Sequence, residues 1–162
     1  MAPPATRRTS QARSAGILLY RRSPDGRLEV LLVHPGGPFW ARRDGGAWSI
    51  PKGEYGPDED PLAAARREFE EELGAAAPCG ASHDLGEIRQ RTGKIVRAWA
   101  LAGDLDVTAI TSNTCLIEWP PRSGRQLEIP EVDQAGWFGL EQAREKINPA
   151  QAELINRLAE RV

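Results

Sequence analysis

Residues 53–75 read GEYGPDEDPLAAARREFEEELGA, and they hold the clearest helix signal in the chain. Asp60 suits the N-cap position, and Pro61 suits the first position of a helix. Gly74 suits the left-handed residue that ends one. Between these ends, four apolar residues recur at helical spacing and share one side: Leu62, Ala65, Phe69 and Leu73. The stretch therefore predicts a helix from Asp60 to Leu73 whose apolar side packs into the core.

Three glutamates share a different side of the same helix. Glu68, Glu71 and Glu72 are neighbours because residues three and four apart lie next to each other on a helix. Like charges at this spacing destabilise a helix, and Arg66 and Arg67 compensate only in part. Two interpretations stay open, a solvated acidic face or a carboxylate cluster for hard divalent cations. Mg²⁺ prefers oxygen ligands and is commonly held by carboxylates together with substrate phosphates.

Two short apolar runs precede this helix. SAGILLYRR (14–22) and LEVLLVH (28–34) flank a Ser-Pro-Asp-Gly turn signal, which predicts a hairpin of two buried strands. Residues 35–46 form a Gly/Pro-rich loop, and loops of that length are often functional. Residues 47–51 are predicted to be a brief strand that leads into Lys52.

More strands and two helices are predicted after the acidic helix. Residues 86–103 predict two strands that turn near Gly93, and residues 111–120 predict another. Residues 140–146 predict a helix, and Asn148 caps a last helix that runs to about Arg161. Strands before, between and after helices indicate an α/β or α+β layer structure with a mixed sheet. No repeat or linker divides residues 14–162, so they are predicted to form one domain after a disordered arm at 1–13.

Composition narrows the classes of partner. The 162 residues carry 21 Lys and Arg against 23 Asp and Glu, a formal charge of -2, which lacks the basic excess that non-specific nucleic-acid or anionic-membrane binding needs. No apolar run approaches the ~20 residues of a membrane span. Cys79 and Cys115 have neither disulfide-framework nor zinc-site spacing, so a reducing cytoplasm is the default location. With the scattered His34 and His83, they are expected to be packing or surface residues.

Residues 53–75 resemble the Nudix box, G-x5-E-x7-R-E-U-x-E-E-x-G-U, in which U is a bulky aliphatic residue. Every invariant position is filled, by Gly53, Glu59, Arg67, Glu68, Glu71, Glu72 and Gly74. Phe69 replaces an aliphatic residue, and Ala75 is smaller than the pattern prefers. A short motif gains weight from its context. Here the predicted strands and helices on both sides are similar to the α/β/α sandwich of the Nudix family, with a central mixed sheet.

The resemblance implies a metal site in a loop-helix-loop. Glu68, Glu71 and Glu72 would bind Mg²⁺ or Mn²⁺, and the region of Gly53 would add a backbone carbonyl, that of Lys52. The implied reaction is hydrolysis of a phosphoanhydride bond in a nucleoside diphosphate linked to another group. Metals that bridge phosphates neutralise developing charge and can turn a bound water into a nucleophile near neutral pH.

The resemblance also assigns catalytic roles. Arg67 would orient a glutamate, and Glu59 would support the loop. Family members recruit the general base from different places, so Glu68 is the first candidate within the box. PEVDQAGWF (130–138) resembles the acidic loop before the family's last Trp-containing strand, which makes Glu131 a second candidate. An exposed loop carboxylate is the alternative for Glu131, and Glu128 and Asp133 are the fallback choices.

The substrate class follows from Pro51-Lys52-Gly53, which resembles the Nudix subset that acts on dinucleoside polyphosphates or diphosphoinositol phosphates. Lys52 would add positive charge beside the phosphate chain, against the alternative of an ordinary surface lysine. Base recognition usually needs an aromatic face, and the loops offer Phe39, Trp40 and Tyr55 for it. Trp40 is the preferred candidate. Local packing is the alternative for Trp40. Four arginines could grip distal phosphates or be solvated: Arg42, Arg43, Arg122 and Arg125.

The resulting prediction is a cytoplasmic Nudix pyrophosphohydrolase, monomeric or homodimeric, with a small-molecule nucleotide substrate. That substrate is a dinucleoside polyphosphate of the diadenosine tetraphosphate type or a nucleoside triphosphate. Removal of pyrophosphate from the 5′ end of RNA is an alternative that the low net charge disfavours. A non-catalytic Nudix domain that senses a nucleotide is another, although such domains typically lose box carboxylates.

Overall fold

The computed structural model describes residues 12–162, which form eight strands, three α-helices and two short 3₁₀ helices. The strands are β1 (Arg13–Arg22), β2 (Leu28–Pro35), β3 (Lys52–Glu54), β4 (Ser82–Arg89), β5 (Ile95–Ala102), β6 (Thr114–Glu118), β7 (Gln126–Pro130) and β8 (Val132–Gly139). The helices are α1 (Pro61–Leu73), α2 (Leu140–Lys146) and α3 (Ala152–Arg161), with 3₁₀ turns η2 (Val107–Ala109) and η3 (Pro149–Gln151). Residues 1–11, most of the predicted arm, lie outside the described residues.

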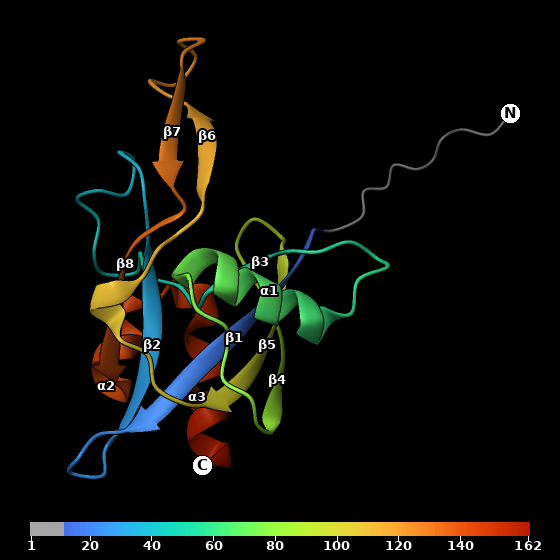
Figure 1. Cartoon of the computed structure of the whole chain (residues 1–162), viewed down its shortest axis with the longest axis vertical. Helices are drawn as coiled ribbons and strands as arrows, with labels where there is room; N and C mark the ends of the chain where they lie inside the picture. The colour runs from blue at the N-terminus through green and yellow to red at the C-terminus, as the bar shows by residue number, and fades with distance from the viewer. Residues whose placement is uncertain (1–11) are drawn as a thin grey trace, which may run out of the picture.

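Six of the strands form one mixed sheet between two layers of helix (Figure 1). The strand order is β4-β5-β1-β2-β8, and β3 pairs with β1. β1 and β5 run parallel, and the other pairs of this sheet are antiparallel. Helix α1 covers one face, and α2 and α3 cover the other. The predicted α/β/α sandwich with a central mixed sheet is confirmed.

Strand β1 lies in the middle of the sheet, and both of its faces are covered by helices. This position explains why its central residues form a continuous apolar run. Successive side chains of a strand point to opposite faces. Ile17 and Leu19 pack with the α1 layer, and Leu18 packs with the α2 and α3 layer. All three side chains are fully buried, as expected for a strand that is covered on both faces.

Helix α1 begins and ends where the sequence predicts. The Asp60 side chain accepts a hydrogen bond from the backbone N–H of Ala63 at 3.0 Å, and Pro61 occupies the first turn. Gly74 ends the helix in the left-handed region, with φ of 78°. Phe69 and Leu73 are buried as predicted, so the helix is fixed against the sheet by its apolar side.

One local prediction is wrong, and one strand is missing from the predicted elements. Residues 47–51 do not form a strand, because Trp48 and Ser49 make only isolated bridges and the regular pairing begins at Lys52. The backbone N–H of Ile50 instead donates to the side-chain Oε1 of Gln151 at 3.1 Å. Strand β7 is absent from the predicted elements, although Leu127 and Ile129 alternate with polar residues along it. With β6 it forms a separate two-stranded sheet that stands away from the core (Figure 1).

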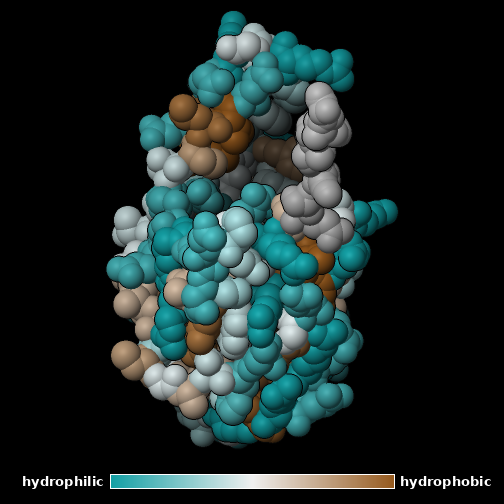
Figure 2. All heavy atoms as spheres, turned by 90° about the vertical axis from the view of Figure 1, so that its right-hand side faces the viewer, coloured by the Kyte–Doolittle hydropathy of each residue, from teal (hydrophilic) through white to brown (hydrophobic). Residues whose placement is uncertain are grey.

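The β6–β7 hairpin also carries apolar surface. Leu116 is 66% exposed and Leu127 is 39% exposed. Figure 2 shows apolar side chains on the projecting hairpin above a hollow, whereas hydrophilic side chains cover most of the body below. Among residues 12–162, none of the helices has the length and apolar character needed to cross a membrane.

Candidate functional site

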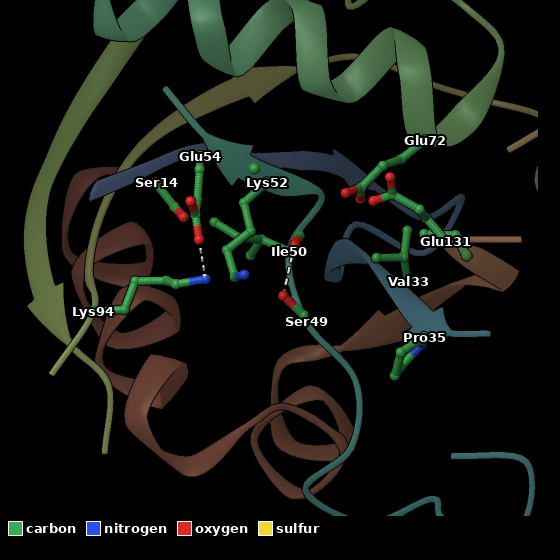
Figure 3. A pocket seen from close by; sticks show the side chains of 12 residues that line it. Ser14, Val33, Pro35, Ser49, Ile50, Lys52, Glu54, Glu72, Lys94 and Glu131 are labelled. Carbon is green, nitrogen blue, oxygen red and sulfur yellow. Dashed lines mark hydrogen bonds and ion pairs between the residues drawn. The ribbon is translucent and has the colours of Figure 1, made fainter. Parts of the chain in front are cut away.

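A cavity of about 330 Å³ lies where β3, the C-terminal part of α1 and the segment before β8 meet (Figure 3). Carboxylates from Glu72 and Glu131 line one end, beside Val33 and Pro35. Lys94, Glu54 and Ser14 line the other end, and Lys52 lies between the two ends. The cavity therefore joins an acidic end to a cationic end.

Glu72 is the most deeply buried acid of the cavity. It projects from the last turn of α1 and is only 6% exposed, and its carboxylate points toward that of Glu131 (Figure 3). Burial is the main reason that the pKa of Glu72 is raised to about 8; the charges of Glu68 and Glu131 contribute to the rise, and Lys52 opposes it. A raised carboxyl pKa means that nearby positive charge does not balance the buried negative charge. A divalent cation would supply that balance.

Glu68 faces the same region from one turn earlier in α1. Its pKa is raised mainly by burial, and Glu71 and Glu131 add to the rise, whereas a hydrogen bond from Arg67 lowers it. A Cβ atom on Gly53 would overlap the carboxylate of Glu68. The absence of a side chain at Gly53 thus lets β3 lie directly against this carboxylate, which is the approach that a backbone-carbonyl ligand in this region requires.

Arg67 ties the remaining box residues together. Its Nε and Nη2 donate to the two oxygens of Glu59 at 2.9 and 3.1 Å, a bidentate pair that lowers the pKa of Glu59. Its Nη1 donates to Glu68 at 2.8 Å and to Glu71 at 3.2 Å. Arg67 therefore joins the loop before α1 to two of the predicted ligands; its orienting role and the supporting role of Glu59 stay predictions.

The donor set fits Mg²⁺ or Mn²⁺ in its chemistry. Glu68, Glu71 and Glu72 supply carboxylate oxygens, the ligands that hard divalent cations prefer. In the part of the chain that the structure describes, no three acidic, His or Cys side chains are already gathered into a metal-ligand cluster. Nη1 of Arg67 holds Glu68 and Glu71 by hydrogen bonds, and Glu72 lines the cavity.

The cationic end contains a residue that the sequence analysis missed. Lys94 Nζ lies 3.0 Å from a carboxylate oxygen of Glu54, and its side chain points into the cavity (Figure 3). Burial, and then the charge of Lys94, lower the pKa of Lys52, whereas Glu72 and Glu54 oppose the shift. Ser14 Oγ is buried and finds no hydrogen-bond partner among residues 12–162. Two ammonium groups and a free hydroxyl donor suit a bound phosphate.

The structure does not bring the predicted base-binding residues to this cavity. Trp40 packs against the α2 and α3 layer of the core, with the Phe39 ring at 4.9 Å. Arg43 donates to the Phe39 carbonyl at 3.1 Å and lies over its ring. Tyr55 packs against the α1 layer. None of these four side chains lines the cavity, so their roles in substrate binding stay predictions.

The fallback acids are held elsewhere. Glu128 accepts a hydrogen bond from Thr114 on the hairpin, at 2.7 Å. Asp133 lies 2.9 Å from the ring of His34, which is buried as expected for a packing residue. Of the three acids considered outside the box, only Glu131 lines the cavity.

Solved structures share the fold. The chain superposes on an Ap4A hydrolase of C. elegans in a binary complex, with a TM-score of 0.63 and 24% identity over 92% of this chain and 96% of that one. The NUDIX domain of NrtR from Shewanella oneidensis, complexed with ADP ribose, gives a TM-score of 0.67 and 18% identity over 99% and 93%. The MutT protein of Methanosarcina mazei gives 0.58 and 19% over 95% and 98%. Comparison with curated proteins finds no match.

The family model of the NUDIX domain matches residues 10–158, nearly the whole chain. The match extends well beyond the box to the sheet and the C-terminal helices. With every invariant position of the box filled and its carboxylates beside a cavity, the chain belongs to the NUDIX family and is a Nudix pyrophosphohydrolase.

Proposed function

We propose that the chain hydrolyses a phosphoanhydride bond of a dinucleoside polyphosphate, of the diadenosine tetraphosphate type, or of a nucleoside triphosphate. The observation that carries the proposal is the cavity, because the carboxylates of Glu72 and Glu131 line one end, Lys94 lies at the other beside Glu54, and Lys52 lies between them. A polyphosphate chain needs both, a site for cations that neutralise the reacting phosphate and fixed positive charge along the flanking phosphates.

Nudix hydrolases generally use divalent metal ions. Here Glu68, Glu71 and Glu72 would hold Mg²⁺ or Mn²⁺, together with the backbone carbonyl of Lys52. When bound, the metal would neutralise phosphate charge and lower the pKa of a bound water. Glu131 is our candidate for the group that accepts the proton of the attacking water, because it lines the cavity opposite Glu72.

The chain's own cations would hold the substrate. Lys52 and Lys94 would donate charge-assisted hydrogen bonds to phosphate oxygens on the side of the cavity away from Glu131. Ser14 Oγ would donate a third. These donors suit phosphate oxygens, which supports a substrate with linked phosphates.

Similar proteins support the substrate class without fixing it. The C. elegans structure is named as an Ap4A hydrolase, and the NrtR domain is complexed with ADP ribose, so both names point to nucleotides with linked phosphates. The Pro51-Lys52-Gly53 run favours the former. We further propose a cytoplasmic location, supported by the free thiols of Cys79 and Cys115, and a monomer or homodimer.

Lys94→Met is expected to raise KM for the polyphosphate substrate by about 10- to 100-fold, because a charge-assisted hydrogen bond contributes about 1.5–3 kcal/mol. Arg91→Met is the matched control, since Arg91 is an exposed cation on the same turn and does not line the cavity. Steady-state kinetics at saturating Mg²⁺ would measure both. A KM for Lys94→Met equal to that of the control would remove Lys94 from the substrate site.

A hydrolysis screen tests the proposal as a whole. The panel contains diadenosine polyphosphates, canonical and oxidised nucleoside triphosphates, ADP-ribose, nucleotide sugars, diphosphoinositol phosphates and 5′-triphosphorylated RNA, each with Mg²⁺ and with product identification. We expect cleavage of diadenosine tetraphosphate to ATP and AMP to be fastest. Preferred cleavage of triphosphorylated RNA would favour the RNA 5′ pyrophosphohydrolase. Nucleotide binding without turnover across the panel would favour a sensor.

A further inference from the structure

Asn113 lies between the carboxylate helix and Glu131. Its backbone N–H donates to the carbonyl oxygen of Glu71 at 2.9 Å, and its own carbonyl accepts from the N–H of Glu131 at 2.9 Å. A second hydrogen bond joins this segment to the end of α1, because the backbone N–H of Thr111 donates to the carbonyl oxygen of Leu73. The backbone of Asn113 thus sets the spacing between α1 and Glu131 independently of its side chain.

The side chain of Asn113 acts on Glu131 directly. Its Nδ2 donates to Glu131 Oε1 at 3.2 Å. Its Oδ1 is buried and finds no donor within residues 12–162. Rotating the amide by half a turn would place two acceptors against each other, so the contact with the carboxylate decides its orientation.

This arrangement is not explained by stability. The cost of a buried acceptor without a partner is similar in size to what a hydrogen bond to a carboxylate returns, so the pair adds little net stability. The side chain of Asn113 instead acts on the carboxylate of Glu131. That carboxylate lies close enough to Glu68 and Glu72 for its charge to affect both. An N–H donor on one oxygen offsets that repulsion, fixes the rotamer and leaves the other oxygen toward the cavity.

We propose that Asn113 is a positioning residue for Glu131, holding its carboxylate as a proton acceptor at the acidic end of the cavity. This inference rests on the proposed function, in which Glu131 accepts a proton from the attacking water. The sequence shows no motif at Asn113, because its partners Glu71 and Glu131 are brought to it only by the fold.

The test uses Asn113→Leu and Asn113→Asp in the full chain, with Thr114→Val as the matched control. Asn113→Leu keeps the size of the side chain and removes the donor to Glu131, whereas Asn113→Asp also places a second carboxylate beside it. Thr114, the next residue in the chain, donates a similar hydrogen bond to the carboxylate of Glu128. Neither Thr114 nor Glu128 lines the cavity. We expect kcat for diadenosine tetraphosphate to fall about 10- to 100-fold in both Asn113 variants, a range set by the loss of one positioning interaction. For Asn113→Leu, KM and Mn²⁺ affinity should stay within about twofold of the wild type and the Tm within about 2–3 °C, because the lost hydrogen bond and the removed unpaired acceptor nearly offset each other.

The double variant Asn113→Leu/Glu131→Gln separates positioning from a general structural effect. If Asn113 acts through Glu131, the double variant should be no slower than Glu131→Gln alone, because residues that act as a unit are not additive. Additive losses, a change confined to KM, or unchanged kcat in both single variants would overturn the inference while leaving the proposed function intact. A wild-type chain without metal-dependent hydrolysis would overturn both.

Discussion

Glu72→Gln is expected to lower kcat for Mg²⁺-dependent hydrolysis by about 10³-fold, equivalent to about 4 kcal/mol of transition-state stabilisation. Glutamine has nearly the same shape but carries no charge, so the variant loses a metal ligand without leaving a hole. Of the three glutamates predicted to be ligands, Glu72 is the one that lines the cavity, which is why its loss should cost more than that of the partly exposed Glu71. Initial rates at saturating Mg²⁺ would measure the effect. A variant within tenfold of the wild type would place the metal site elsewhere.

The same substitution should stabilise the metal-free protein at high pH. The pKa of Glu72 rises from 4.5 to about 8 in the folded chain, so the folded state binds more protons than the unfolded state between these values. Stability of the wild type is therefore lost as the pH rises through this window, and glutamine, which cannot ionise, avoids the loss. With EDTA, Tm values should agree at pH 4 and favour the variant at pH 8.5. A variant with the lower Tm at pH 8.5 would contradict the buried, unbalanced charge.

Gly53→Ala is expected to lower kcat by about 10²-fold, the size of effect that a displacement of about 1 Å at a reacting group produces. The added Cβ would overlap the carboxylate of Glu68, so either that side chain or strand β3 must move. Gly56→Ala is the matched control on the same loop, because a Cβ at Gly56 meets nothing within 4 Å.

Both glycine variants would be measured by kcat and by Mn²⁺ affinity. We expect Gly56→Ala to stay within about twofold of the wild type, as a surface change without a partner should. Normal turnover and Mn²⁺ affinity in Gly53→Ala would show that the close approach of β3 to Glu68 has no part in the site.

The parts of the site that are local in sequence could be predicted from the sequence. Asp60, Pro61 and Gly74 fix the ends of α1, and helical spacing then places Glu68 and Glu72 on one side of it. The pattern does not show that both carboxylates are buried whereas Glu71 is held by Arg67, because that depends on what packs against the helix.

The parts that depend on long-range pairing could not be predicted. Ser14 meets the turn that carries Lys94 only because β1 pairs in parallel with β5, in a register that joins Ser14 to Val96. Asn113 meets Glu131 through the connections around the β6–β7 hairpin, a long-range pairing that the sequence pattern does not specify. Trp40 shows the reverse error, because the sequence suggests an aromatic side chain free in a loop and suited to base stacking. In the structure this side chain packs against the core.

Hydrolysis of diadenosine tetraphosphate in ¹⁸O-labelled water, with Mg²⁺ and again with EDTA, would test most directly whether the cavity performs metal-dependent attack of water on phosphorus. Mass spectrometry of the products should find one ¹⁸O atom in a phosphate of ATP or AMP for each bond cleaved, and no products with EDTA. Unlabelled products, cleavage that continues in EDTA, or binding of the nucleotide without any cleavage would contradict the proposed chemistry.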